Sequence, residues 1–173
     1  MERLIAEGWV ERIPHRGLFV RNFSPEQIQS IYGVREMFDG EAARLAAPQI
    51  TGEQLDELAR INRLIDAAAR DEDFHAAREA DTHFHRLIVR YVGNPKLEEM
   101  FEPVVLMTLG SLLPMEDELP YEREATRNML SAAGHEKICQ ALANHDAAAA
   151  EQMARQHVRA ACGMSARLLV HRR

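Results

Sequence analysis

Two N-terminal capping boxes, each followed by apolar residues spaced three and four apart, constrain the fold of this chain more than any other feature. The boxes are residues 24–27 (SPEQ) and residues 51–54 (TGEQ). In such a box the Ser or Thr side chain accepts a hydrogen bond from the N3 amide, and the N3 Gln side chain reaches back to the cap. In the first box, Pro25 also suits the first helical position. The chain is therefore expected to begin an amphipathic helix at each box.

The same periodicity continues to the C-terminus and predicts about six helices joined by short loops. Abundant Ala and Leu and an aromatic content of 6% also favour helices over sheets. We therefore expect an all-α fold, an antiparallel bundle of about six helices. The expected elements are helices over residues 24–47, from residue 51 onward, 73–92, 95–113, 121–143 and 146–170, with a break in the fifth helix near residues 131–134 and an acidic connector over 114–120.

The N-terminal segment has a different pattern. Residues 1–8 resemble the end of a helix closed by Gly8, and residues 9–23 are expected to form a short β-hairpin, in which Pro14 and Gly17 mark the turn. The tip carries Arg12, His15 and Arg16, whereas the whole chain has a net charge of −6. The acidic balance argues against a nucleic-acid-binding surface on the bulk of the chain.

The two cysteines, Cys139 and Cys162, lie on predicted helices at positions that suit small side chains. They have neither the spacing of a zinc finger nor that of a redox pair, so we expect free, buried thiols. No signal peptide is visible, and the longest apolar run, residues 104–115, is too short to span a bilayer. These features fit a cytoplasmic, reducing compartment.

Four polar residues fall on the apolar faces of predicted helices, where an unpaired polar side chain is costly. Asp81 and His85 are four residues apart and share one helix face. His135 and His157 flank a predicted turn at residues 144–146 at similar distances, so folding of that hairpin brings them to the same height. The pattern fits either a metal site or a buried Asp–His hydrogen-bond network. The remaining histidines, His15, His75, His83, His145 and His171, are expected to be solvated.

A carboxylate with three imidazoles suits divalent transition metals, and the sequence does not choose among Zn²⁺, Ni²⁺, Mn²⁺, Fe²⁺ and Co²⁺. An enzyme should also supply a general base or nucleophile near the metal. Glu79 and Glu136 neighbour the four residues in sequence but not on their faces, which weakens a hydrolase interpretation, and we expect no catalytic residues. Arg35 lies near the apolar face of the first bundle helix. It is expected either to snorkel, to pair with Asp39, or to bind an effector carboxylate.

Four segments together resemble the FCD ligand-binding domain of GntR-type bacterial transcription regulators, in the FadR-like subfamily. The segments are LIAEGWVERIPHRGLFVRNFS, IYGVREMFDGEAARLAA, DTHFHRLIVRYVGNPKL and GHEKICQALANHDAAAAEQMARQHV. The resemblance implies an all-α antiparallel bundle that dimerises and senses small organic acids. It also implies metal ligands at Asp81, His85, His135 and His157, and an effector contact at Arg35. One departure is Phe38-Asp39, where the family more often has Leu-Glu.

The resemblance divides the chain into residues 1–23, a remnant of a winged helix-turn-helix, and residues 24–173, the effector-binding and dimerisation domain. The remnant would comprise the end of the recognition helix and the wing, whose Arg12, His15 and Arg16 offer weak phosphate contacts. We therefore expect that this chain alone does not bind an operator specifically. The expected function is a metal-binding, acid-sensing regulator domain; a metalloenzyme on a helical bundle and a metal-free interaction module are the alternatives.

Overall fold

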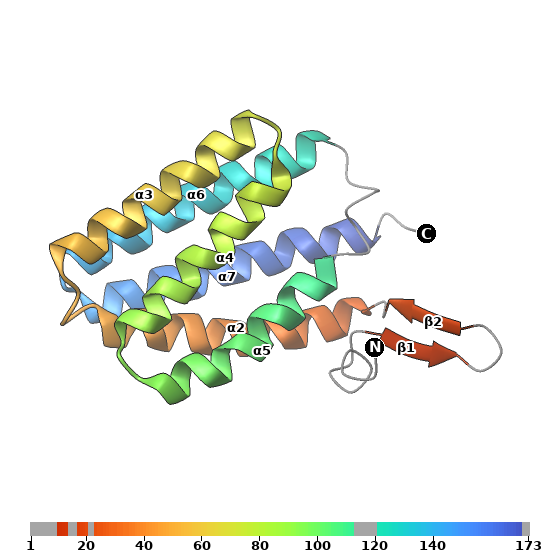
Figure 1. The fold of residues 1–173 in the computed structure, drawn as a ribbon, viewed down its shortest axis with the longest axis horizontal. Helices are drawn as coiled ribbons and strands as arrows, with labels where there is room; N and C mark the ends of the chain where they lie inside the picture. Colours follow the sequence, from red (N-terminus) through yellow and green to blue (C-terminus); the bar gives the residue numbers. More distant parts are fainter. Residues whose placement is uncertain (1–9, 14–16, 21–22, 113–120, 171–173) are drawn as a thin grey trace.

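Six helices form an antiparallel bundle in a computed structural model that describes residues 10–13, 17–20, 23–112 and 121–170 (Figure 1). Helix α2 packs along α7, and α3 packs against both α4 and α6. Helix α5 lies against α2 and α4. The expected all-α bundle is thus confirmed. Its helices are α2 (Pro25–Ala46), α3 (Gly52–Arg70), α4 (Phe74–Tyr91), α5 (Pro95–Leu112), α6 (Tyr121–Ala143) and α7 (Ala147–Val170).

The helix starts follow the capping signals of the sequence. The Ser24 hydroxyl accepts from the Gln27 amide at 3.3 Å, and the Gln27 side chain accepts from the Ser24 amide at 2.9 Å. The box at Thr51 closes in the same way, and Asp146 accepts from the Ala149 amide at 3.0 Å to begin α7. These bonds satisfy amides that have no partner within the helix, so each helix begins where the sequence predicts.

Helix α6 is continuous from Tyr121 to Ala143, so the break expected near residues 131–134 was wrong. Ser131 and Gly134 suggested a loop because Ser and Gly are poor helix formers. Ser131 instead donates a side-chain hydrogen bond to Asp81 on α4. Gly134 leaves room for His157 on α7, because a Cβ at this position would collide with the imidazole. Both residues serve close packing between helices.

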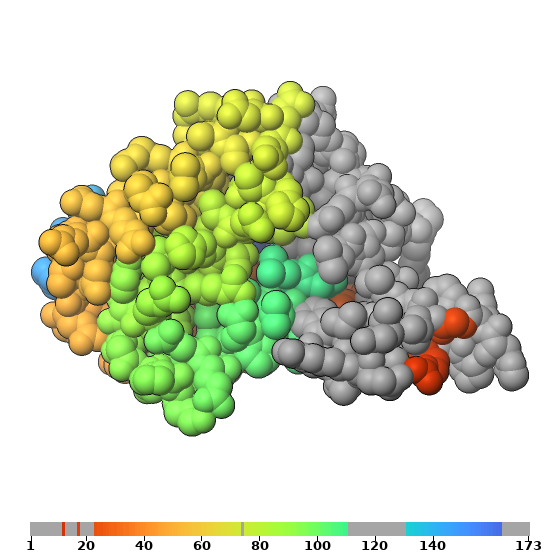
Figure 2. Space-filling view, in the orientation of Figure 1, coloured from red at the N-terminus to blue at the C-terminus, as the bar shows by residue number. Residues whose placement is uncertain are grey.

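The hydrophobic core runs between all six helices and contains Leu58, Phe84, Phe101 and Ile138, each almost completely buried. Small residues of α2 and α7 let these two helices pack closely. The side chains of α3, α4 and α5 cover the face shown in Figure 2. A group of polar residues is buried within this apolar interior: Arg35, Asp39, Thr82, His85, Thr108 and His135.

Two short strands precede the bundle. Strand β1 (Val10–Ile13) pairs antiparallel with β2 (Gly17–Val20), with Val10 opposite Val20 and Ile13 opposite Gly17. Residues 1–9, 14–16 and 113–120 lie outside the described residues, and with them the expected helix end, the hairpin tip and the acidic connector. The assignment of this segment to a winged helix-turn-helix stays a prediction. In the part of the chain that the structure describes, no helix is both long and apolar enough to cross a membrane.

Candidate metal centre

The structure brings together the four residues that the sequence singled out. Asp81 and His85 come from α4, His135 from α6 and His157 from α7. Each offers one nitrogen or oxygen such that these four atoms all lie within 4.8 Å of one another. His85 and His135 are almost completely buried, and the side chain of Asp81 is 24% exposed. The predicted convergence of His135 and His157 is therefore confirmed. Both imidazoles also lie close to Asp81 and His85, as expected.

The spacing of the donor atoms suits a single ion. His85 Nε2 and His135 Nε2 are 3.2 Å apart, and His135 Nε2 is 3.5 Å from Asp81 Oδ1. The His157 ring centroid lies 4.5 Å from that of His135 and 5.1 Å from that of His85. Two nitrogens bound to the same zinc ion at about 2.0–2.1 Å lie about 3 Å apart. The pairs His85–His135 and His135–Asp81 thus have donor separations that suit one small divalent cation, and His157 lies beside them.

Two further residues orient the imidazoles. His85 Nδ1 is 2.5 Å from Asp39 Oδ1, and His135 Nδ1 is 3.2 Å from Asn62 Oδ1. A carboxylate or amide oxygen can only accept here, so both Nδ1 atoms carry the proton and both Nε2 atoms direct a lone pair into the cluster. Two lone pairs that face each other at 3.2 Å repel unless a metal ion or a shared proton lies between them. The donor set therefore fits a bound metal ion.

Asp39 and Asn62 were not predicted as part of the site. The signal that identified Asp81 and the histidines was also present for them. Asp39 lies one turn after Arg35 on the buried face of α2, and Asn62 lies between the buried Leu58 and Ile65 on α3. Polar residues on an apolar face were the clue in each case.

Arg35 is buried and lies between two carboxylates. Its Nε is 3.3 Å from Asp39 Oδ2, and its terminal nitrogen is 4.0 Å from Asp81 Oδ2. The expected pair with Asp39 is confirmed, while the snorkelling alternative was wrong because only 9% of the residue is exposed. A guanidinium in a dry site stabilises ionised carboxylates, so the cluster keeps both acids charged.

The protonation states match those of metal ligands. Burial and the neighbouring His157 hold the pKa of His135 well below its ordinary value, and burial with His85 nearby lowers the pKa of His157 to about 3. Burial alone would raise the pKa of Asp81, but His135, His85 and Arg35 lower it below the ordinary range. Neutral imidazoles and an ionised carboxylate are the forms that bind metals.

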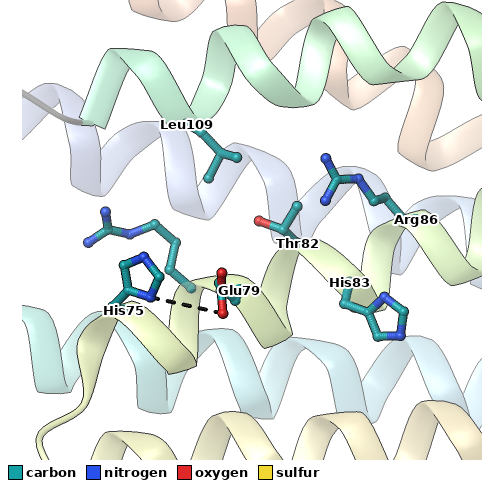
Figure 3. A pocket seen from close by; sticks show the side chains of 7 residues that line it. His75, Glu79, Thr82, His83, Arg86 and Leu109 are labelled. Atoms are coloured by element: carbon teal, nitrogen blue, oxygen red, sulfur yellow. Dashed lines mark ion pairs between the residues drawn. The ribbon is translucent and has the colours of Figure 1, made fainter.

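A cavity of about 520 Å³ is lined by side chains of α4 and α5 (Figure 3). Neither Arg35 nor any of the four clustered residues lines it. Within the described residues, α4 thus turns Asp81 and His85 inward and presents a second polar face to this cavity. The side chains that line it are His75, Arg78, Glu79, Thr82, His83, Arg86 and Leu109.

The other sequence predictions have mixed outcomes. Glu79 has a side chain that is 74% exposed and Glu136 is also exposed, so neither faces the cluster. His75 is solvated as expected, whereas the exposed His145 also contacts the Ala47 carbonyl at 2.8 Å through Nδ1. Cys139 and Cys162 are free thiols, partly buried rather than fully. Arg12 is exposed, and His15, Arg16 and His171 lie outside the described residues.

The fold and the site define this chain as a six-helix bundle domain with a buried His/Asp cluster. Comparison with known proteins identifies the family of this domain. The FCD domain family matches residues 30–160. The chain therefore belongs to the FCD domain family, the domain of GntR-type regulators that its motifs resemble.

Its relatives are transcription regulators rather than enzymes, as the sequence predicted. An uncharacterised HTH-type transcriptional regulator of Bacillus subtilis, YcbG, is 30% identical over 122 residues, which are 70% of this chain and 47% of that protein. The galactonate operon transcriptional repressor of Escherichia coli is 25% identical over 87% of this chain and 71% of its own length. The chain thus spans about half of one relative and about seven tenths of the other.

Solved structures share the fold. McbR/YncC of E. coli superposes with a TM-score of 0.82 at 17% identity, over 95% of this chain and 80% of its own. A GntR transcriptional regulator from Rhodococcus sp. RHA1 superposes with a TM-score of 0.77 at 22% identity, over 99% of this chain and 78% of its own. At these identities the likeness establishes the fold of the bundle.

Proposed function

We propose that this chain is the effector-sensing, metal-binding domain of a bacterial DNA-binding transcription regulator that responds to a small organic acid. The observation that carries the proposal is the convergence of Asp81, His85, His135 and His157 beside the buried Arg35. The ion would be a divalent transition metal, with Zn²⁺, Ni²⁺, Mn²⁺ and Fe²⁺ as candidates, because a set of three nitrogens and one oxygen suits each of them.

The charge of the site supports an acid as the effector. Asp39 and Asp81 carry one negative charge each and Arg35 one positive charge, whereas His135 and His157 are neutral at pH 7. Leaving His85 aside, these groups carry a net charge of −1, which attracts a cation. A bound divalent ion reverses the sign, so the loaded site attracts an anion.

Arg35 is the proposed effector contact. Its guanidinium can form two parallel bonds to a carboxylate, and a second oxygen of the acid could complete the coordination of the metal. One relative is named for a galactonate operon, which is compatible with an acid effector. The cavity lined by α4 and α5 lacks Arg35, so the proposal requires the acid to reach the cluster itself.

The proposed signal is a change in helix packing. The four ligands come from α4, α6 and α7, and Arg35 comes from α2. An effector that binds the metal and Arg35 together would favour one arrangement of these helices over another. In a homodimer, that shift would change the spacing of the two DNA-binding domains, so that effector and operator affinities are coupled.

Operator binding would belong to the complete regulator. We propose that residues 1–23 are a remnant of a winged helix-turn-helix, that Arg12, His15 and Arg16 contact phosphates only weakly, and that residues 24–173 bind the effector and dimerise. The regulator would act in the cytoplasm. An electrophoretic mobility shift assay tests this division, and tight, sequence-specific binding by this chain alone would refute it.

The test of the sensor is calorimetry with a panel of small mono- and dicarboxylic acids on metal-loaded and metal-stripped protein. We expect at least one acid to bind the loaded protein at least tenfold more tightly. Equal affinity in both forms would mean that the metal has only a structural role. The absence of stoichiometric metal in protein purified without a metal-affinity column would favour the metal-free interaction module instead.

A further inference from the structure

Each of the two buried imidazoles contacts a polar side chain that lies outside the ligand set. His85 contacts Asp39 of α2 at 2.5 Å, and His135 contacts Asn62 of α3 at 3.2 Å, in both cases through Nδ1. The two Nε2 atoms face each other at 3.2 Å. Helices α2 and α3 contribute no ligand to the described cluster, yet each places one side chain behind a ligand.

The Asn62 side chain is fixed in one orientation. Its Nδ2 donates to the Ala132 carbonyl at 3.0 Å, which turns its oxygen toward His135. Ala132 lies on α6, less than one turn before His135. A reversed amide would lose the bond to Ala132 and present a second donor to the imidazole. Asn62 therefore accepts the Nδ1 proton and leaves the Nε2 lone pair to the cluster.

Asp39 differs from Asn62 in charge and in its second partner. Its Oδ1 accepts from His85 and its Oδ2 from Arg35, so one carboxylate links a ligand to the arginine. A carboxylate behind an imidazole fixes the ring and also makes it a stronger base toward a metal, whereas an amide only fixes the ring. The two contacts should therefore contribute unequally.

We propose that Asp39 and Asn62 are the positioning residues of the metal centre, and this rests on the proposed metal-binding function. Asp39 fixes the tautomer of His85 and raises its basicity. Asn62 fixes the tautomer of His135 and adds no charge. Through them α2 and α3, which hold no ligand, determine the affinity of the site for its ion.

The first experiment needs no metal. Long-range ¹H–¹⁵N correlation spectra of the metal-stripped chain report which ring nitrogen carries the proton. We expect protonated Nδ1 in both His85 and His135. In Asn62→Leu the His135 signal should shift toward the other tautomer while His85 is unchanged. Protonation of His135 mainly at Nε2 in the wild-type chain, or no response to Asn62→Leu, would overturn the role of Asn62.

The second experiment measures metal affinity by competition of Zn²⁺ with a chromophoric chelator, and ligand geometry by the visible spectrum of the Co²⁺-loaded chain. Loss of a residue that orients a ligand typically weakens affinity about 10–100-fold, and we expect this for Asn62→Leu. Arg63→Leu, an exposed neighbour on the same helix, is the matched control. Unchanged affinity and spectrum in Asn62→Leu would contradict the proposal.

Asn62→Asp separates positioning from structural support. An aspartate keeps the acceptor for His135 but loses the donor to the Ala132 carbonyl. We expect a lower melting temperature with Zn²⁺ affinity equal to or above that of wild type, because a carboxylate makes the imidazole a stronger base. A structural role alone would lower both, and parallel losses would refute positioning by Asn62.

Asp39→Asn tests the charge behind His85. The amide oxygen still accepts the Nδ1 proton, so the His85 tautomer should persist in the metal-stripped spectra while Zn²⁺ affinity falls about tenfold. An unchanged affinity would overturn the role of Asp39. If wild-type protein binds neither Zn²⁺ nor Co²⁺, the proposed metal function fails, and the metal-free spectra still decide whether the two residues fix the tautomers.

Discussion

The two sides of α4 carry the same kinds of residue and behave in opposite ways. The inner side presents Asp81 and His85 to a buried cluster, whereas the outer side presents His75, Glu79 and Arg86 to a cavity open to solvent. His75 faces Glu79 at 3.9 Å with both side chains about three-quarters exposed, and Arg86 pairs with Glu102 at the surface. Burial, and not residue type, distinguishes the candidate site from a solvated helix face.

The largest expected difference between the two sides is in metal binding. His85→Ala removes a buried ligand together with the contact to Asp39, so Zn²⁺ affinity should fall more than 100-fold. His83→Ala on the outer side should leave the affinity unchanged. Competition with a chelator measures both, and circular dichroism shows whether each variant is folded. Similar losses of Zn²⁺ affinity in the two variants would contradict the distinction between the inner and outer sides of α4.

The second difference is in the stability of the metal-free chain. Arg35→Met leaves Asp39 and Asp81 without their cationic partner, and breaking a buried ion pair costs about 3–5 kcal/mol. Arg86→Met removes a partly exposed pair and should cost about 0–1 kcal/mol. Urea denaturation measures both free energies of unfolding. Saturating Zn²⁺ should restore part of the loss in Arg35→Met only, because the ion supplies positive charge beside Asp81.

A smaller difference should appear in the pH dependence of stability. The pKa values of His135 and His157 are lowered in the folded chain, so below about pH 6.5 the unfolded chain binds more protons. The free energy of unfolding of metal-free protein should therefore fall between pH 7 and pH 5, by at most about 1.4 kcal/mol per pH unit for each histidine. The lowered pKa values of Asp39 and Asp81 add to this loss only below about pH 4.

Urea denaturation at several pH values checks this slope. His157→Gln should roughly halve it, because one of the two imidazoles whose pKa is lowered is gone. His83→Gln, on the outer side of α4, is the matched control and should leave the slope unchanged. A metal-free wild-type chain whose stability does not change from pH 7 to pH 5 would show that the buried histidines do not behave as the structure indicates.

The sequence predicted those parts of the fold and site that depend on spacing within one helix or hairpin. The capping boxes located the starts of α2 and α3. The four-residue spacing placed Asp81 beside His85, and the turn at residues 144–146 paired His135 with His157. Each of these relations follows from helix geometry over a short stretch of chain.

Contacts between separate helices were harder to predict. The approach of Asp39 to His85 and of Asn62 to His135 depends on how far α2 and α3 are rotated about their axes, which is set by the packing of the whole bundle. The same difficulty led to the wrong break in α6. Ser131 and Gly134 are poor helix formers, but their presence is explained by contacts with Asp81 and His157 on other helices.

The position of the cluster along the chain gives it a topological consequence. His85 and His135 are 50 residues apart in sequence, and an ion held by both would close that stretch into a loop. Such a cross-link lowers the conformational entropy of the unfolded chain, as a disulfide does, provided that the ion stays bound there. Loss of the metal would thus lower the free energy of unfolding of the whole bundle, because the unfolded chain regains that entropy.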